Sequence, residues 1–181
     1  MTNIESLRKG TSDLHKTLEG MMYSDAIMNK TLSETQLNHL LLVNYLFFKR
    51  VESILSNQKT PASFHIDKAS RAKKDLIRNG YHPQDVDYKL SADYSLESLY
   101  GILYVVIGSS LGANLISKKL LGNSRLNNSS FDFYKSAQND RHIWTEFLKE
   151  LEHKLMEQDK LVSQSVNCFR SMIDLFNLTA K

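Results

Sequence analysis

The stretch SLYGILYVVIGSSLGANLIS, residues 98–117, decides the fold class because it contains no charged residue. Glu97 and Lys118 flank it, and a helix of this length would just span a bilayer. The stretch also holds several serines, Asn114 and three glycines, and a lone span of this polarity inserts poorly into lipid. We therefore predict the central helix of a soluble protein, buried on most of its sides, and no membrane association.

The composition of the whole chain supports long helices. With 181 residues the chain can bury a substantial core, and we expect one domain over residues 1–181. Hydrophobic residues make up 41% and charged residues 24%, which excludes a disordered chain. Two prolines and seven glycines are too few for the frequent turns of an all-β fold. The predicted fold class is all-α.

Charge and cysteine content exclude other classes. The net charge of +3 is mild and does not indicate a general nucleic-acid binder. Cys168 is the only cysteine, which excludes an internal disulfide framework and a cysteine-based zinc site. The polar N-terminus lacks the basic start and apolar run of a signal peptide, so we expect a cytoplasmic protein.

The hydrophobic periodicity predicts about seven helices and no strand. Ser33 and Gln36 match a capping box at the start of the third helix. Loops are expected over 81–93 and 123–130. The expected helices cover residues 4–22, a short segment after Ser24, and residues 33–57, 66–78, 95–121, 133–158 and 159–178.

Most histidines carry little signal for a metal site. His39, His65, His82 and His142 lie in loops or beside polar residues, where surface histidines are common. A ferritin-like di-iron site needs two Glu-x-x-His motifs, and only Glu150-x-x-His153 fits, in a charged stretch that favours a solvated helix face. The sequence also lacks a Gly-rich phosphate loop and a Gly-x-Ser-x-Gly elbow.

His15 lies on an amphipathic first helix, where a histidine can be a satisfied core residue or an axial haem ligand. Glu19 lies one turn on and could accept the Nδ1 proton, and Arg8 lies two turns back on the same face. Gly108 and Gly112 lie one turn apart, although each glycine costs about 1 kcal/mol inside a helix. Their spacing is compatible with close approach of a ligand and equally with tight helix packing.

These segments resemble the bacterial haem oxygenase family. Residues 7–19, LRKGTSDLHKTLE, resemble its proximal helix, and residues 101–113, GILYVVIGSSLGA, resemble its distal helix. Residues 71–80 are similar to the phytochrome-associated branch, and the distal helix has a form found in bacterial members such as the neisserial ones. The resemblance extends from about residue 4 to residue 178 and implies a haem oxygenase-like bundle.

The resemblance also implies roles for individual residues. His15 would be the proximal iron ligand, Glu19 would orient it, and haem would lie beneath a distal wall that includes Ser109 and the two glycines. The residues at ligand-binding positions are Arg8 and Tyr104 for the propionates, Gly108 and Gly112 over the iron, and Arg170 as a weaker propionate candidate.

Three positions depart from the family pattern. Ile107 stands where one branch has glutamate, and Ser109 corresponds to the animal-type distal aspartate that holds a water network. Asn114 stands where glutamine or an apolar residue is usual. These changes bear on proton delivery and on which bridge carbon of the ring is attacked.

The activity implied by the resemblance is cleavage of haem to biliverdin, CO and iron, with haem as both substrate and cofactor. It needs O2 and electrons from a ferredoxin or a flavoprotein reductase, and a biliverdin-using protein is a further partner. The alternatives are a non-catalytic haem-binding protein of the same fold, and a structural bundle or a thiaminase-like relative. The late position of Cys168 disfavours a cysteine nucleophile of the thiaminase-like kind.

Overall fold

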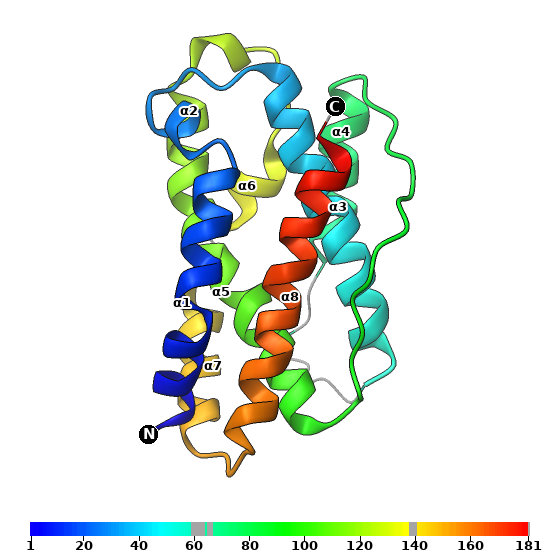
Figure 1. Ribbon diagram of the computed structural model, residues 1–181. Coiled ribbons are helices and arrows are strands. Elements are labelled where there is room, and N and C mark those ends of the chain that lie inside the picture. The colour runs from blue at the N-terminus through cyan, green and yellow to red at the C-terminus, as the bar shows by residue number, and fades with distance from the viewer. Residues whose placement is uncertain (59–63, 65–66, 138–140, 181) are drawn as a thin grey trace.

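The fold is a bundle of α-helices, shown in Figure 1. The structure is a computed structural model that describes residues 1–58, 64, 67–137 and 141–180. Within these residues there is a short 3-10 helix, Ser124–Leu126, and no strand, so the all-α prediction is confirmed. The α-helices are α1 (Asn3–Met21), α2 (Ser24–Met28), α3 (Glu34–Ser56), α4 (Ala69–Arg78), α5 (Leu96–Leu121), α6 (Asp132–Ser136), α7 (Arg141–Glu152) and α8 (Gln158–Thr179).

The uncharged stretch forms α5, the central helix, which packs against α8, α7, α6 and α2. Ile102, Leu103 and Val106 on this helix are completely buried. In the described part of the chain, α5 is the one helix long and apolar enough to cross a membrane, and half of its most apolar window is buried against other helices. Such burial is what the core helix of a helical bundle shows.

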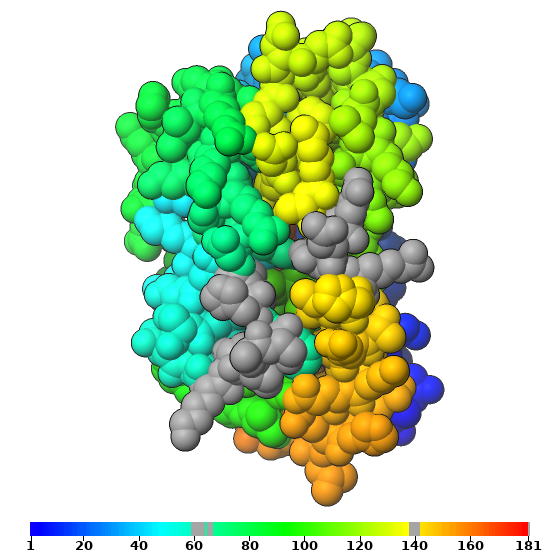
Figure 2. Space-filling model, turned by 180° about the vertical axis from the view of Figure 1, so that it is seen from behind, coloured from blue at the N-terminus to red at the C-terminus, as the bar shows by residue number. Residues whose placement is uncertain are grey.

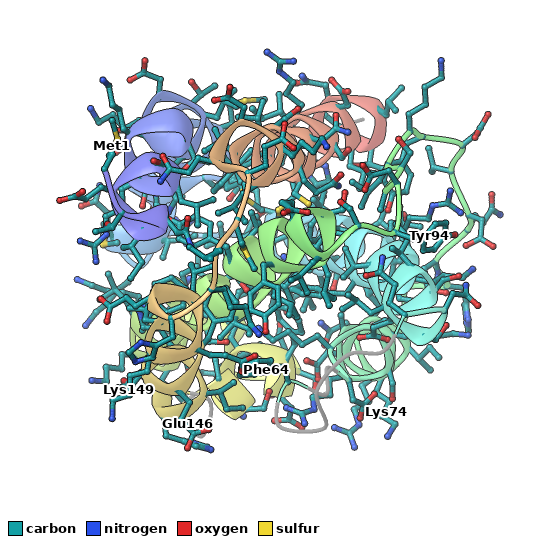
Figure 3. All side chains as sticks on the ribbon, turned by 90° about the horizontal axis from the view of Figure 1, so that it is seen from below. Met1, Phe64, Lys74, Tyr94, Glu146 and Lys149 are labelled. Carbon is teal, nitrogen blue, oxygen red and sulfur yellow. The ribbon has the colours of Figure 1, made fainter. Side chains whose placement is uncertain are left out.

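Helix α8 supports both α1 and α5, which make little backbone contact with each other among the described residues. In Figures 1 and 3, α1 runs beside the C-terminal half of α5. The α5–α8 joint is tight because Gly101 carries no side chain, and the Ser165 hydroxyl donates to the Gly101 carbonyl at 2.9 Å. Helices α1 and α5 therefore both pack against α8.

Capping residues in the sequence predicted the starts of α3 and α5 correctly. Ser33 Oγ accepts from the Gln36 backbone N–H at 3.2 Å, and the Gln36 side chain accepts from the Ser33 N–H at 2.9 Å. The predicted capping box of α3 is therefore confirmed. The predicted start of α5 near Ser95 is also correct, because Ser95 Oγ accepts from the Ser98 N–H at 3.1 Å.

Two predictions of helix bounds are wrong, and side chains distant in the sequence cap the observed starts of α4 and α6 and the end of α7. The helix expected from residue 66 begins at Ala69, where the Glu52 carboxylate of α3 accepts from the Ala69 N–H at 2.9 Å. Residue 66 itself lies outside the described residues. The single helix expected over 133–158 is two helices, α6 and α7, and α7 ends at Glu152.

The limits of α6 and α7 depend on caps from elsewhere in the sequence. The buried Asp75 carboxylate of α4 accepts from the Phe133 N–H at 2.7 Å, at the start of α6. The Asn3 amide donates to the carbonyls of Leu151 and Lys154 at 3.0 and 2.9 Å, at the end of α7. These bonds satisfy the backbone groups that a helix end leaves open.

Substitution of Gly101 tests the closeness of α5 and α8. In Gly101→Ala, the new Cβ would lie 2.7 Å from the Leu161 carbonyl oxygen and 2.9 Å from the Gln164 Cβ. Because the helices must move apart, we expect the free energy of unfolding to fall by about 1–3 kcal/mol, measured by urea denaturation. In the control Gly20→Ala, the Cβ meets nothing within 4 Å, so stability should be unchanged or slightly higher. Equal stability of the two variants would contradict the close packing.

Candidate functional site

His15 and Glu19 form a pair on the exposed face of α1. His15 Nδ1 lies 3.4 Å from Glu19 Oε1, and the two side chains are 56% and 64% exposed. The predicted spacing of one helical turn therefore does bring the two groups together. Because Nδ1 faces the carboxylate, Nε2 is the ring nitrogen that is left to bind a metal ion.

Phe169 on α8 packs against His15, a contact that the sequence analysis missed. The ring centroids are 5.7 Å apart in an edge-to-face arrangement. The sequence carried one signal, since Phe169 is the neighbour of the candidate Arg170. Arg170 and Arg8 are both exposed, as charged groups that meet propionates need to be.

Gly112 lies on an exposed part of α5. A Cβ at this position would meet nothing within 4 Å, so the main chain itself is open to approach. Leu111 and Leu115 on either side are 43% and 48% exposed. An exposed apolar strip of this kind is typical of a binding surface.

Gly108 differs from Gly112 because Trp144 of α7 lies against it. A Cβ on Gly108 would be 3.2 Å from the indole ring, so the tryptophan occupies the space that a side chain would need. Trp144 also contacts Tyr104, with ring centroids 5.6 Å apart, and stacks on Phe147 at 5.9 Å. Tyr104 and Gly108 thus share one aromatic neighbour, which sequence reasoning did not predict, although Trp144 is the sole tryptophan.

Ser109 is exposed, and its hydroxyl points to Lys68. Ser109 Oγ donates to the Val106 carbonyl at 2.7 Å and accepts from Lys68 Nζ at 3.2 Å. Ile107, the departure next to it, is buried, and the Asn114 side-chain oxygen is buried without a hydrogen-bond partner in the structure. The serine therefore interacts with a lysine that the sequence analysis had not singled out.

The remaining candidates give no metal cluster. Among the described residues, no three histidines, cysteines or acids gather in a way that could hold a metal ion. Glu150 is only partly solvated, which corrects the expected solvated face, because Tyr100 OH donates to it and Lys154 lies 3.3 Å away. His153 is exposed. Burial raises the pKa of the Cys168 thiol to about 12, which disfavours a nucleophilic thiolate.

His39 is a half-buried helix residue and not the surface histidine expected. Its Nδ1 lies 2.7 Å from Tyr23 OH and its Nε2 lies 2.9 Å from Thr179 Oγ1. Its ring packs against Phe176, with centroids 4.5 Å apart. The histidine links the segment after α1 to the end of α8.

Two comparisons with known proteins agree with this architecture. A family model described as heme oxygenase matches residues 2–178. The chain belongs to the haem oxygenase family. The fold of this family member is similar to that of the haem oxygenase from Neisseria meningitidis solved with NO and CO bound, with a TM-score of 0.70. The two share 17% identity, and the match covers 99% of this chain and 92% of the neisserial one. No curated protein matches significantly.

Family membership supports haem binding and haem degradation as the general activity of this haem oxygenase relative. The described geometry fits the ligand. The open main chain at Gly112 leaves room that a side chain would fill, and the His15–Glu19 pair offers an oriented imidazole. Haem would place a large apolar ring against the strip formed by Leu111 and Leu115.

The environment of His39 predicts a pH dependence of stability. Burial lowers the pKa of His39, and the Phe176 backbone offsets part of this effect. The unfolded chain then binds more protons as the pH falls, so the free energy of unfolding should decrease from about pH 7 toward pH 5. We expect His39→Gln to flatten this decrease in urea denaturation at a series of pH values. The control His153→Gln, at an exposed position, should leave the pH dependence of the free energy of unfolding as it is in the wild type. An unaltered pH dependence in His39→Gln would rule out His39 as its source.

Proposed function

We propose that this protein cleaves haem oxidatively to biliverdin, CO and iron, with the ring held between α1 and α5. The exposed strip of α5 is the observation that carries the proposal. Gly112 is bare and open between the exposed Leu111 and Leu115, whereas the first half of α5 is largely core. An apolar ring laid against this strip would remove it from water, which is favourable.

On the proximal side, His15 would bind the iron through Nε2. Glu19 Oε1 lies 3.4 Å from Nδ1, and in the haem complex the carboxylate would orient the imidazole and fix its tautomer by accepting the Nδ1 proton. Phe169 limits rotation of the ring by its edge-to-face contact. These two neighbours hold the imidazole in one orientation on an otherwise exposed helix face.

On the distal side, Gly112 would give the ligand access to main chain, whereas Gly108, which we expected over the iron, lies against Trp144. Bound haem supplies the O2 chemistry, and the protein supplies position, exclusion of water and protons. Gly112 admits close approach because no side chain stands over it, and Trp144 closes the strip at Gly108. Tyr104, held against Trp144, and the exposed Arg8 and Arg170 are the groups we assign to the propionates.

The electrons would come from outside the chain. We assign a ferredoxin or a flavoprotein reductase as donor, in keeping with the absence of a nucleotide-binding motif from the sequence. A protein that takes up biliverdin would be a second partner. A cytoplasmic location fits both partners.

A second candidate function is haem binding without turnover. Ser109 supports it, because this serine stands in place of the distal aspartate of animal-type members and its hydroxyl is engaged by Lys68. Storage or sensing of haem would need the same proximal pair and the same open strip. The two candidate functions differ only in whether bound haem is degraded or stays intact after it has been reduced under O2.

A haemin titration tests ligand binding. We expect the wild-type protein to give a Soret band with a histidine-ligated spectrum, and His15→Ala to lose that spectrum and to bind haemin at least about tenfold more weakly. His153→Ala is the matched control, since His153 is exposed beyond the end of α7. A wild-type protein without a Soret band would exclude both candidate functions. Reduction with ascorbate under O2 should then bleach the band and raise biliverdin absorbance; a stable complex would favour the non-catalytic candidate.

Replacement of Gly112 tests the open strip. Gly112→Leu should retain haemin but slow its degradation by about tenfold or more, because the added side chain stands where the ligand must approach. Gly112→Ala should raise the free energy of unfolding of the protein without haem by about 0.5–1 kcal/mol, since the site is open and alanine favours the helix. Unchanged turnover in Gly112→Leu would refute the assigned role of the glycine.

A further inference from the structure

Lys68 joins α4 to the turn of α5 that contains Gly108. Its Nζ donates to the Val106 carbonyl at 3.0 Å, to Ser109 Oγ at 3.2 Å and to Ser110 Oγ at 2.8 Å. The three acceptors all belong to one turn of α5. These bonds tie Lys68 to one turn of α5, as a mobile surface lysine would not be tied.

The backbone of Lys68 is fixed as well as its ammonium group. Its N–H donates to Glu52 Oε1 of α3 at 2.7 Å, and the ammonium lies 5.1 Å from the centre of the Phe48 ring. Figure 2 shows this back face of the molecule, where α3 and α4 lie beside each other and opposite α6 and α7. Lys68 is therefore bonded to α3 through its backbone N–H and to α5 through its ammonium group, and it links the positions of these two helices.

The contact falls on a turn that needs support. Ser109 and Ser110 directly follow Gly108, and Gly112 comes two residues later, so this turn is rich in residues that weaken a helix. The Ser109 hydroxyl donates to the Val106 carbonyl of its own helix, and such back-bonding by a serine weakens and bends the hydrogen-bond ladder. External hydrogen bonds from a fixed ammonium compensate for this weakness.

We infer that Lys68 is a positioning residue for haem chemistry: it holds the Gly108–Gly112 turn of α5 in place and sets a positive charge beside it. The inference rests on the proposed function, because the turn matters for chemistry only if haem lies against it. Lys68 itself is not one of the site residues that the family resemblance supplied, whereas its acceptor Ser109 is one of them. Val106, Ser109 and Ser110 lie on the side of α5 opposite Leu111 and Leu115, so the charge of Lys68 would act on an anionic ligand of haem from across the helix.

The first measurement needs no haem. Hydrogen exchange of the amides of residues 108–113 should be at least about tenfold faster in Lys68→Met than in the wild type, because the charged hydrogen bonds that hold the turn are lost. Lys74→Met is the matched control on α4, since Lys74 lies at the edge of the molecule in Figure 3. Equal exchange in the two variants overturns the inference.

The second measurement uses the ferric haem-loaded protein. Azide affinity, read from the Soret band, should fall about threefold to tenfold in Lys68→Met, because one positive charge near an anion has been removed. Lys68→Arg keeps the charge and should recover most of the azide affinity, whereas the affinity for neutral imidazole should change less than that for azide. Unchanged azide affinity in Lys68→Met overturns the role toward haem even if exchange is faster.

These readouts separate the two proposals. A wild-type protein that forms no Soret band contradicts the proposed function and with it the role of Lys68 toward haem, while hydrogen exchange still decides whether Lys68 holds α5. A normal Soret band in all variants with equal azide affinities contradicts the inference about Lys68 alone.

Discussion

The rest of the structure depends on the way α5 is buried. This helix must be apolar enough to fill the centre of the bundle, and it must also keep one strip of its surface free. Its first half meets α8 so closely that only a glycine fits at residue 101, with the Leu161 carbonyl directly opposite. Its second half leaves Leu111, Gly112 and Leu115 exposed. One helix thus serves as core in one half and, in the function we propose, as the surface for haem in the other, and both roles suit a run of twenty residues without charge.

Helix α8 gives this arrangement its rigidity. It supports α5 on one side and α1 on the other, and it supplies Phe169 to the proposed iron ligand. The two walls that we propose for haem are therefore helices that both pack on α8 and make little backbone contact with each other among the described residues. Because the support is common, a change in the packing of α8 would alter both walls together.

Local patterns in the sequence predicted part of this fold and site. The uncharged run predicted α5, the capping box predicted the start of α3, and the one-turn spacing predicted the contact between His15 and Glu19. Each of these signals acts over a few residues, so each can be read from the chain itself. Features that depend on distant partners could not be read in this way. Glu52, Asp75 and Asn3 set helix ends far away in the sequence, and Trp144 and Lys68 reach α5 from α7 and from the start of α4.

The dependence of α1 on α8 has a consequence for biosynthesis. Helix α1 leaves the ribosome well before α8, so the helix that carries His15 lacks its main partner until residues 158–179 have been made. Contacts of such long sequence separation form late in folding. In the function we propose, a nascent chain without α8 would lack the helix that joins the two walls, and capture of the pigment would follow the synthesis of α8.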